Sequence, residues 1–103
     1  MELPLDIKKI VDMEKIKKFC ISNHISSLSL FGSILTENFN DSSDIDLLIE
    51  FEPDYIPGFF GLIELQFNLS KIFNNRKIDL RTKNDLSRYF RQEVLNQAVV
   101  IYG

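Results

Sequence analysis

Residues 44 to 51 read DIDLLIEF, and this octapeptide is the clearest strand in the chain. Side chains alternate between the two faces of a strand, so four apolar residues share one face. They are Ile45, Leu47, Ile49 and Phe51. The opposite face begins with two carboxylates, Asp44 and Asp46, and continues with Leu48 and Glu50. The pattern predicts a strand with one buried face and one acidic face.

The two aspartates are the first candidate for chemistry. Residues two apart on a strand lie roughly 7 Å apart on the same side, so their side chains can converge on one point. Like charges held that close repel, and a cation between them relieves the repulsion. Magnesium is the natural choice because it takes hard oxygen ligands and keeps positions free for water and phosphate. The plain alternative is a solvated sheet face. Glu50, farther along the same face, is either a further ligand or a solvated rim residue.

A second short strand carries the matching acid. In KIDLR, residues 77 to 81, Ile78 and Leu80 face one way, and Asp79 and Arg81 face the other. If the two strands are neighbours, Asp79 completes a three-acid cluster. Arg81 shares the face of Asp79 and either contacts phosphate or pairs with an acid.

A glycine-serine turn precedes the acidic strand. SLSLF, residues 27 to 31, alternates as a strand and ends at Gly32. Glycine allows the backbone to approach a ligand closely, and free N–H groups at the start of a following short helix, residues 33 to 37, can hold a phosphate. Ser33 adds a hydroxyl, and residues 38 to 43 read as a polar loop. Each feature alone is ordinary, but a phosphate-binding turn facing an acid cluster is suited to transfer of a phosphorus-centred group from a nucleoside triphosphate.

The spacing of apolar residues in the rest of the chain predicts the fold class. Apolar residues recur at helical spacing from Asp6 to about Asn23, from Phe59 to Phe73 and from about Asp85 to Ala98, and VVIY, residues 99 to 102, reads as extended. Strands alternating with helices over short connections predict an α+β fold. We expect one small mixed sheet with helices mainly on one face, which leaves the other face for chemistry.

Composition narrows the class of protein. The 103 residues suit a single domain spanning 1–103, and the formal charge of -3 gives no broad cationic surface, so no direct nucleic-acid binding is expected. The single cysteine, Cys20, lies among apolar residues and is expected in the core. With neither a signal peptide nor a long apolar run in the sequence, we expect no membrane association and a cytoplasmic location.

Two further features leave alternatives open. The lone histidine, His24, is expected at the surface or in a cap, because no second histidine and no nearby cysteine pair offers a zinc site. The aromatic runs at 59 to 62 and 88 to 90 either fill the core or form a partner surface.

These motifs together resemble a known family. LFGS, then SSDIDLLIEFEP, KIDLRTKNDLSRYFR and the ending VLNQAVVIYG are similar to the minimal nucleotidyltransferases of the DNA polymerase beta superfamily, from about Met13 to Gly103. The resemblance implies the polymerase beta-like nucleotidyltransferase fold and assigns roles to five residues. Gly32 and Ser33 contact the triphosphate, and the catalytic, magnesium-binding acids are Asp44, Asp46 and Asp79. Ser43 is expected to shape the turn before the strand and to orient Asp44, and we count it among the nucleotide-binding residues.

The resemblance also implies a biological role. Relatives are commonly antitoxins of HEPN-type ribonuclease toxins, so the implied activity is magnesium-dependent transfer of AMP from ATP to a toxin tyrosine. The alternatives are an antitoxin that acts by binding alone and, in third place, nucleotide transfer to a small molecule. The chain departs from the pattern after Gly32-Ser33: many relatives have GSRARG there, whereas this sequence continues with residues 34 to 37, ILTE.

Overall fold

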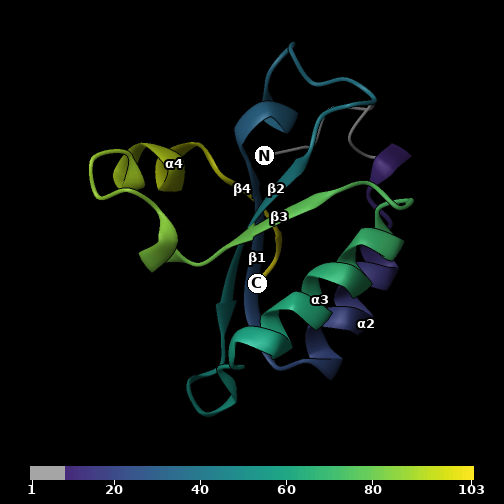
Figure 1. Ribbon diagram of the computed structural model, residues 1–103, viewed down its shortest axis with the longest axis vertical. Helices are drawn as coiled ribbons and strands as arrows, with labels where there is room; N and C mark the ends of the chain where they lie inside the picture. Colours follow the sequence, from purple (N-terminus) through teal and green to yellow (C-terminus); the bar gives the residue numbers. More distant parts are fainter. Residues whose placement is uncertain (1–8) are drawn as a thin grey trace.

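A four-stranded mixed sheet organises the protein, whose computed structural model describes residues 9–103. The strands are β1 (Ile25–Phe31), β2 (Ile45–Phe51), β3 (Ile78–Arg81) and β4 (Val99–Tyr102), and their order is β3-β2-β1-β4 (Figure 1). β1 pairs antiparallel with β2 and with β4, whereas β2 and β3 are parallel. The predicted strands are therefore present, and the extended ending is an edge strand.

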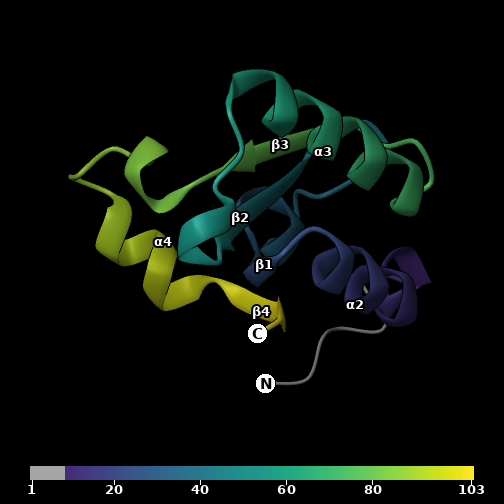
Figure 2. The same ribbon diagram turned by 90° about the horizontal axis from the view of Figure 1, so that it is seen from below.

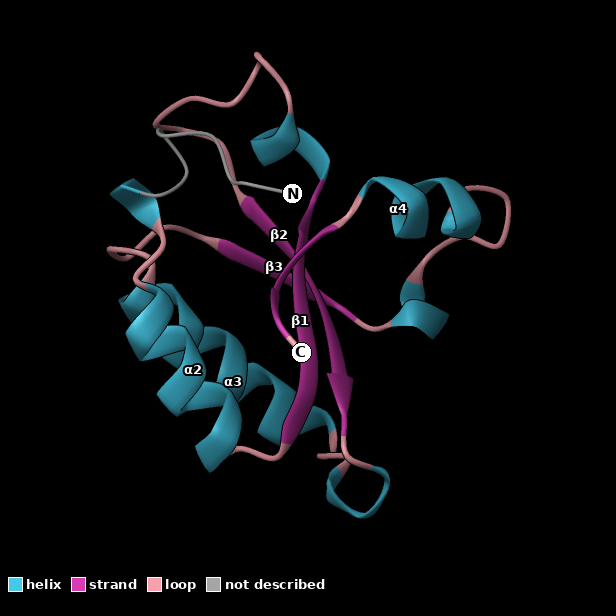
Figure 3. Ribbon diagram, turned by 180° about the vertical axis from the view of Figure 1, so that it is seen from behind, coloured by secondary structure: helices cyan, strands magenta, loops and turns pink. Residues whose placement is uncertain are grey.

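Within residues 11–103, three α-helices flank the sheet, and two of them share a face. α2 (Met13–Ser22) contacts β1 and β4, and α3 (Phe59–Ile72) contacts β3. The shorter α4 (Arg91–Gln97) lies on the opposite side of the sheet (Figures 2 and 3). This confirms the α+β class with helices mainly on one face. Within residues 9–103, no helix has the length and apolar character to cross a membrane.

The core lies between the sheet and the face of α2 and α3. Alternation along the strands turns one set of apolar side chains toward these helices, and burial of each such side chain contributes about 1.5–3 kcal/mol. The buried strand residues include Leu28, Leu30, Ile45, Leu47, Ile49 and Ile78. The helices contribute Ile16, Cys20 and Leu69, and Phe73 follows directly after α3. Cys20 is fully buried as expected, and burial raises the pKa of its thiol to about 12.

The first predicted helix is interrupted. The apolar periodicity predicts a helix from Asp6 to Asn23. Residues 6 to 8 lie outside the described residues, residues 9 and 10 are helical, and after a break at residues 11 and 12 α2 begins at Met13. Asp12 causes the break because its side chain accepts a hydrogen bond from the Lys15 N–H at 3.2 Å, which is an N-cap and not a helix interior. The apolar spacing alone therefore did not show that a helix starts after Asp12.

The last predicted helix is also shorter than expected. The prediction began at Asp85, but residues Lys83–Asp85 form a single 3₁₀ turn, η3, and α4 begins at Arg91. The Asp85 carboxylate accepts hydrogen bonds from the Thr82 N–H and hydroxyl, both at 2.9 Å, so a capping box closes the turn locally. The short helix predicted over 33 to 37 is likewise a 3₁₀ helix, η1 (Gly32–Leu35). β1 starts two residues earlier than expected, at Ile25.

Candidate active site

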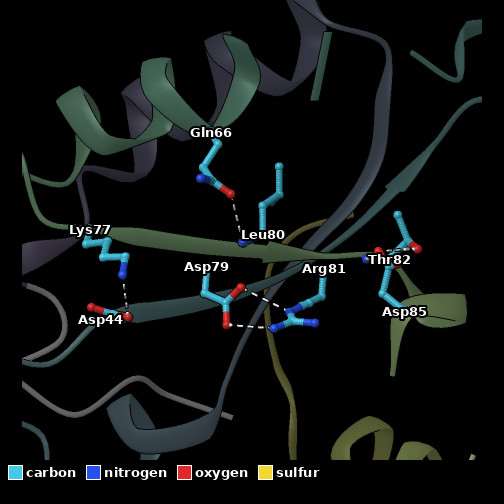
Figure 4. Close-up of polar contacts among 8 residues, drawn as sticks. All are labelled: Asp44, Gln66, Lys77, Asp79, Leu80, Arg81, Thr82 and Asp85. Atoms are coloured by element: carbon cyan, nitrogen blue, oxygen red, sulfur yellow. Dashed lines mark hydrogen bonds and ion pairs between the residues drawn. The ribbon is translucent and has the colours of Figure 1, made fainter. Parts of the chain in front are cut away.

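The acidic face of the sheet brings two of the predicted carboxylates together. Parallel pairing of β2 with β3 places Asp46 opposite Asp79 in register. Both acids are half-buried on this face of the sheet. Figure 4 shows the Asp79 side chain on the side of β3 away from Gln66, a residue of α3. The strand adjacency that the three-acid hypothesis required is present.

The glycine-serine turn lies directly against this pair. Gly32 has a φ of +75°, a left-handed conformation that favours glycine, and a Cβ at this position would overlap the Asp46 carboxylate. The Ser33 backbone N–H favours the charged form of the same carboxylate and so lowers its pKa. Gly32, Ser33, Asp46 and Asp79 therefore form one contiguous site built from η1, β2 and β3.

The electrostatics of Asp46 reflect this crowding. Burial raises the pKa of its carboxyl above the ordinary value of 3.8, and the negative charge of Asp79 together with a hydrogen bond to Asp79 raises it further. The Ser33 N–H opposes this effect, and Asp44 adds a small increase. Asp46 and Asp79 present adjacent hard oxygens of like charge, and a divalent cation bound between them would offset their repulsion.

Two basic side chains pair with the acids. Arg81 donates to Asp79, with Nε–Oδ1 at 3.0 Å and Nη2–Oδ2 at 3.4 Å, and this contact raises the pKa of the guanidinium (Figure 4). Of the two roles open for Arg81, the structure shows pairing with an acid. Lys77 lies 3.8 Å from the Asp44 carboxylate (Figure 4).

Asp44 and Ser43 lie in the segment directly before β2. Asp44 precedes β2 and its carboxylate turns to Lys77, and among residues 9–103 no group of three His, Cys, Asp or Glu side chains is close enough to hold a metal ion. The Ser43 hydroxyl accepts a hydrogen bond from the Asn40 N–H at 3.0 Å and so closes the loop before the strand. In this arrangement Ser43 shapes the approach to Asp44.

Sequence reasoning missed Arg76 as a positioning residue of this site. Its Nη2 donates to the carbonyl oxygens of Asn40 and Ser43, at 2.5 Å and 2.9 Å, and its guanidinium lies 4.5 Å from the centre of the Phe39 ring. Arg76 thereby ties the turn before β3 to the loop before β2. The sequence feature that could have pointed to Arg76 is the basic pair Arg76-Lys77 directly before IDL, residues 78 to 80.

The chain's departure from the GSRARG pattern has a structural counterpart. Ile34 is buried and packs in the core instead of presenting a basic side chain. The Thr36 hydroxyl donates to the Ser33 carbonyl oxygen at 2.8 Å and so closes the turn. Local cations near the acids come instead from Lys77 and Arg81 on the β3 side.

Similarity to known proteins agrees with this geometry. The family model described as polymerase beta, nucleotidyltransferase matches residues 14–103. The chain is 38% identical over 84 residues to MJ1215 of Methanocaldococcus jannaschii, assigned as a protein adenylyltransferase, which covers 79% of this chain and 90% of that relative. It is 30% identical over 77 residues to the protein adenylyltransferase MntA of Thermococcus cleftensis, which covers 75% of each chain.

Solved structures share the fold. One described as a minimal nucleotidyltransferase has a TM-score of 0.72 at 21% identity and covers 95% of this chain and 96% of its own. A toxin-antitoxin structure with AMP-PNP has a TM-score of 0.71 at 23% identity and covers 90% of this chain and 74% of its own. With the acid pair, the glycine-serine turn and these matches in agreement, the chain belongs to the polymerase beta nucleotidyltransferase family.

Proposed function

We propose that this chain, as a single domain of residues 1–103, is a magnesium-dependent protein adenylyltransferase. Its substrate is ATP, and its acceptor is a tyrosine hydroxyl of a partner HEPN-type ribonuclease toxin, which makes the chain an antitoxin. The observation that carries the proposal is the contact of the Asp46 carboxylate with both the Gly32-Ser33 turn and Asp79. We place the reaction in the cytoplasm, where ATP is available and a free cysteine such as Cys20 stays reduced.

The comparisons support the reaction class and the partner. Relatives such as the T. cleftensis MntA are named protein adenylyltransferases, and solved neighbours of the fold are toxin-antitoxin assemblies, including one with AMP-PNP, an ATP analogue. The net charge of -3 suits binding of a basic partner better than direct binding of a nucleic acid.

Each site residue has a role in the transfer. Magnesium held by Asp46 and Asp79, with Asp44 released from Lys77, would neutralise charge on the triphosphate. The N–H groups of the Gly32-Ser33 turn would hold phosphate oxygens, and Ser43 would position Asp44 beside them. The acceptor oxygen attacks the α-phosphorus in line, an O–P bond forms as the bond to the β-phosphate oxygen breaks, and pyrophosphate leaves. Asp79 accepts the hydroxyl proton.

The second candidate function is an antitoxin that acts by binding alone. Two observations favour it: Ile34 replaces a basic triphosphate contact, and Arg81 and Lys77 already neutralise two of the three acids. Covalent change of the partner separates the two functions.

The deciding experiment reads the intact mass of the candidate toxin after incubation with this protein, ATP and magnesium. We expect a gain of one or more AMP units, its loss in Asp46→Asn and in Asp79→Asn, and its retention in Glu50→Gln. Glu50 is a matched control because it lies on the same strand and face as Asp46 but is exposed. A stable complex with unchanged toxin mass would favour the binding-only function.

A further inference from the structure

Exposed apolar side chains lie along the outer side of α3 and in the segment just before it. We define the α3 stripe as the exposed side chains Ile56, Phe59, Phe60, Ile63 and Phe67. Phe59 is 72% exposed, Phe60 82% and Phe67 62%, although they belong to the most apolar helix of the protein. Large exposed patches of this kind on a water-soluble chain mark interaction sites.

Helical geometry explains why the stripe is not part of the core. Leu65 and Leu69 are buried toward the sheet, and positions 59, 63 and 67 lie on a different side of the same helix. No described element covers that side, and the acidic face lies across the sheet from α3 (Figure 4). The stripe is therefore separate from the site proposed for catalysis.

We propose that the α3 stripe is an interface between two copies of this chain. The spacing is self-complementary, because Phe59 and Phe67 lie four residues on either side of Ile63. When two α3 helices pack antiparallel about a two-fold axis through Ile63, each Ile63 meets its symmetry mate and each Phe59 meets a Phe67. An aromatic pair at each end and an aliphatic pair at the centre form a closed contact.

The charges at the two ends of the stripe fit the same arrangement. Lys71, in the last turn of α3, lies with its Nζ 4.6 Å from the centre of the Phe67 ring. Asp54 is exposed in the turn just before α3. Antiparallel packing brings the Lys71 end of each helix to the Asp54 end of the other, whereas parallel packing would place like charges together. The helix dipoles are also opposed in this arrangement.

The area of the α3 stripe indicates how tightly two copies should bind. Its exposed side chains offer roughly 600 Å² per copy, since an exposed aromatic side chain presents about 200 Å². A standard interface uses about 800 Å² per partner, so we expect a reversible dimer of micromolar affinity. Because the acidic face is on the other side of the sheet, both sites of the dimer remain open.

The first test measures the mass of the full chain by sedimentation over a broad range of concentration. We expect the mass to rise from 12.0 kDa toward twice that value. Ile63→Asp places two like charges on the two-fold axis and should weaken the dimer by more than about a hundredfold. Val100→Asp, a matched change at an exposed apolar residue of β4, should leave it intact.

A mass that stays at 12.0 kDa at every concentration overturns the proposal and leaves the stripe to a different protein. A dimer that survives Ile63→Asp, or that Val100→Asp also abolishes, overturns the assignment to α3. Circular dichroism confirms folding of both variants, which change exposed side chains.

A charge exchange tests the antiparallel register. Lys71→Glu and Asp54→Lys should each weaken self-association by about tenfold, because like charges then meet at both ends of the interface. An equimolar mixture of the two variants should recover a dimer, since each end pairs opposite charges again. A mixture that stays as weak as its components contradicts the antiparallel arrangement.

Discussion

Asp46 and Asp79 face each other across the parallel strands β2 and β3, and the Gly32-Ser33 turn closes over Asp46. The electrostatic repulsion between these two carboxylates is the reason why the site favours a bound cation. It is partly relieved by Arg81, which binds Asp79. The following predictions test the pair, its counter-cation, the turn and the loop behind it.

The stability of the metal-free protein should depend on the charge of Asp46. Its pKa is higher in the folded than in the unfolded chain, so the folded state holds the proton more tightly. This contribution is fully present below the ordinary value of 3.8 and is lost as pH rises through the raised folded value. We therefore expect Asp46→Asn to raise the melting temperature at pH 7 in chelator and to have little effect at pH 3. Equal effects at both pH values would contradict the cause given for the shift.

Replacement of Arg81 should change the response to magnesium. Arg81→Gln leaves the charge of Asp79 without its guanidinium partner, and because the pair is exposed we expect a loss of less than about 1 kcal/mol in the metal-free state. A cation then gains more by binding, so the magnesium-induced rise in melting temperature should increase and its midpoint should fall severalfold. Arg88→Gln, which changes an arginine stacked on its neighbour Tyr89, should behave as the unmodified chain. An unchanged magnesium response in Arg81→Gln would show that the guanidinium and the metal do not compete.

A methyl group at the turn should be costly. Gly32→Ala forces a Cβ into the Asp46 carboxylate at a positive φ, so we expect a loss of about 2–4 kcal/mol in the free energy of unfolding. Gly58→Ala is the control, because a Cβ there meets nothing within 4 Å; as a change at the N-cap of α3 it should cost no more than about 1 kcal/mol. Urea unfolding of both variants gives the comparison. Similar values for the two would mean that the turn tolerates the shift of Asp46.

Arg76 should hold the loop that leads to Asp44. Arg76→Met removes the hydrogen bonds to the Asn40 and Ser43 carbonyl oxygens and should lower the free energy of unfolding by about 1–3 kcal/mol. Hydrogen exchange should show faster exchange confined to residues 38 to 44 and to the start of β3. Arg88→Met is the matched control and should change neither measurement. A uniform rise in exchange across the chain would indicate a global effect instead of a local anchor.

Local sequence determined the strands and the long helix. In residues 44 to 51 the alternation of apolar and polar side chains has only one strand register that buries the apolar set, and β2 adopts it. The apolar density from Phe59 likewise predicted α3 nearly to the residue. The predicted starts of the first and last helices were wrong because of local side-chain hydrogen bonds. Those of Asp12 and Asp85 end or prevent a helix where the apolar spacing alone predicts that it continues.

The sequence by itself thus determined which side chains share each strand face and which family motifs the chain carries. Only the tertiary structure decided that β3 lies beside β2 with Asp79 opposite Asp46, that Arg76 reaches a loop more than thirty residues earlier, and that the aromatics of α3 are exposed. The physical reason is the range of the interactions. Alternation and capping act between neighbours in the chain, whereas strand adjacency and helix burial depend on contacts between distant segments, which local patterns do not encode.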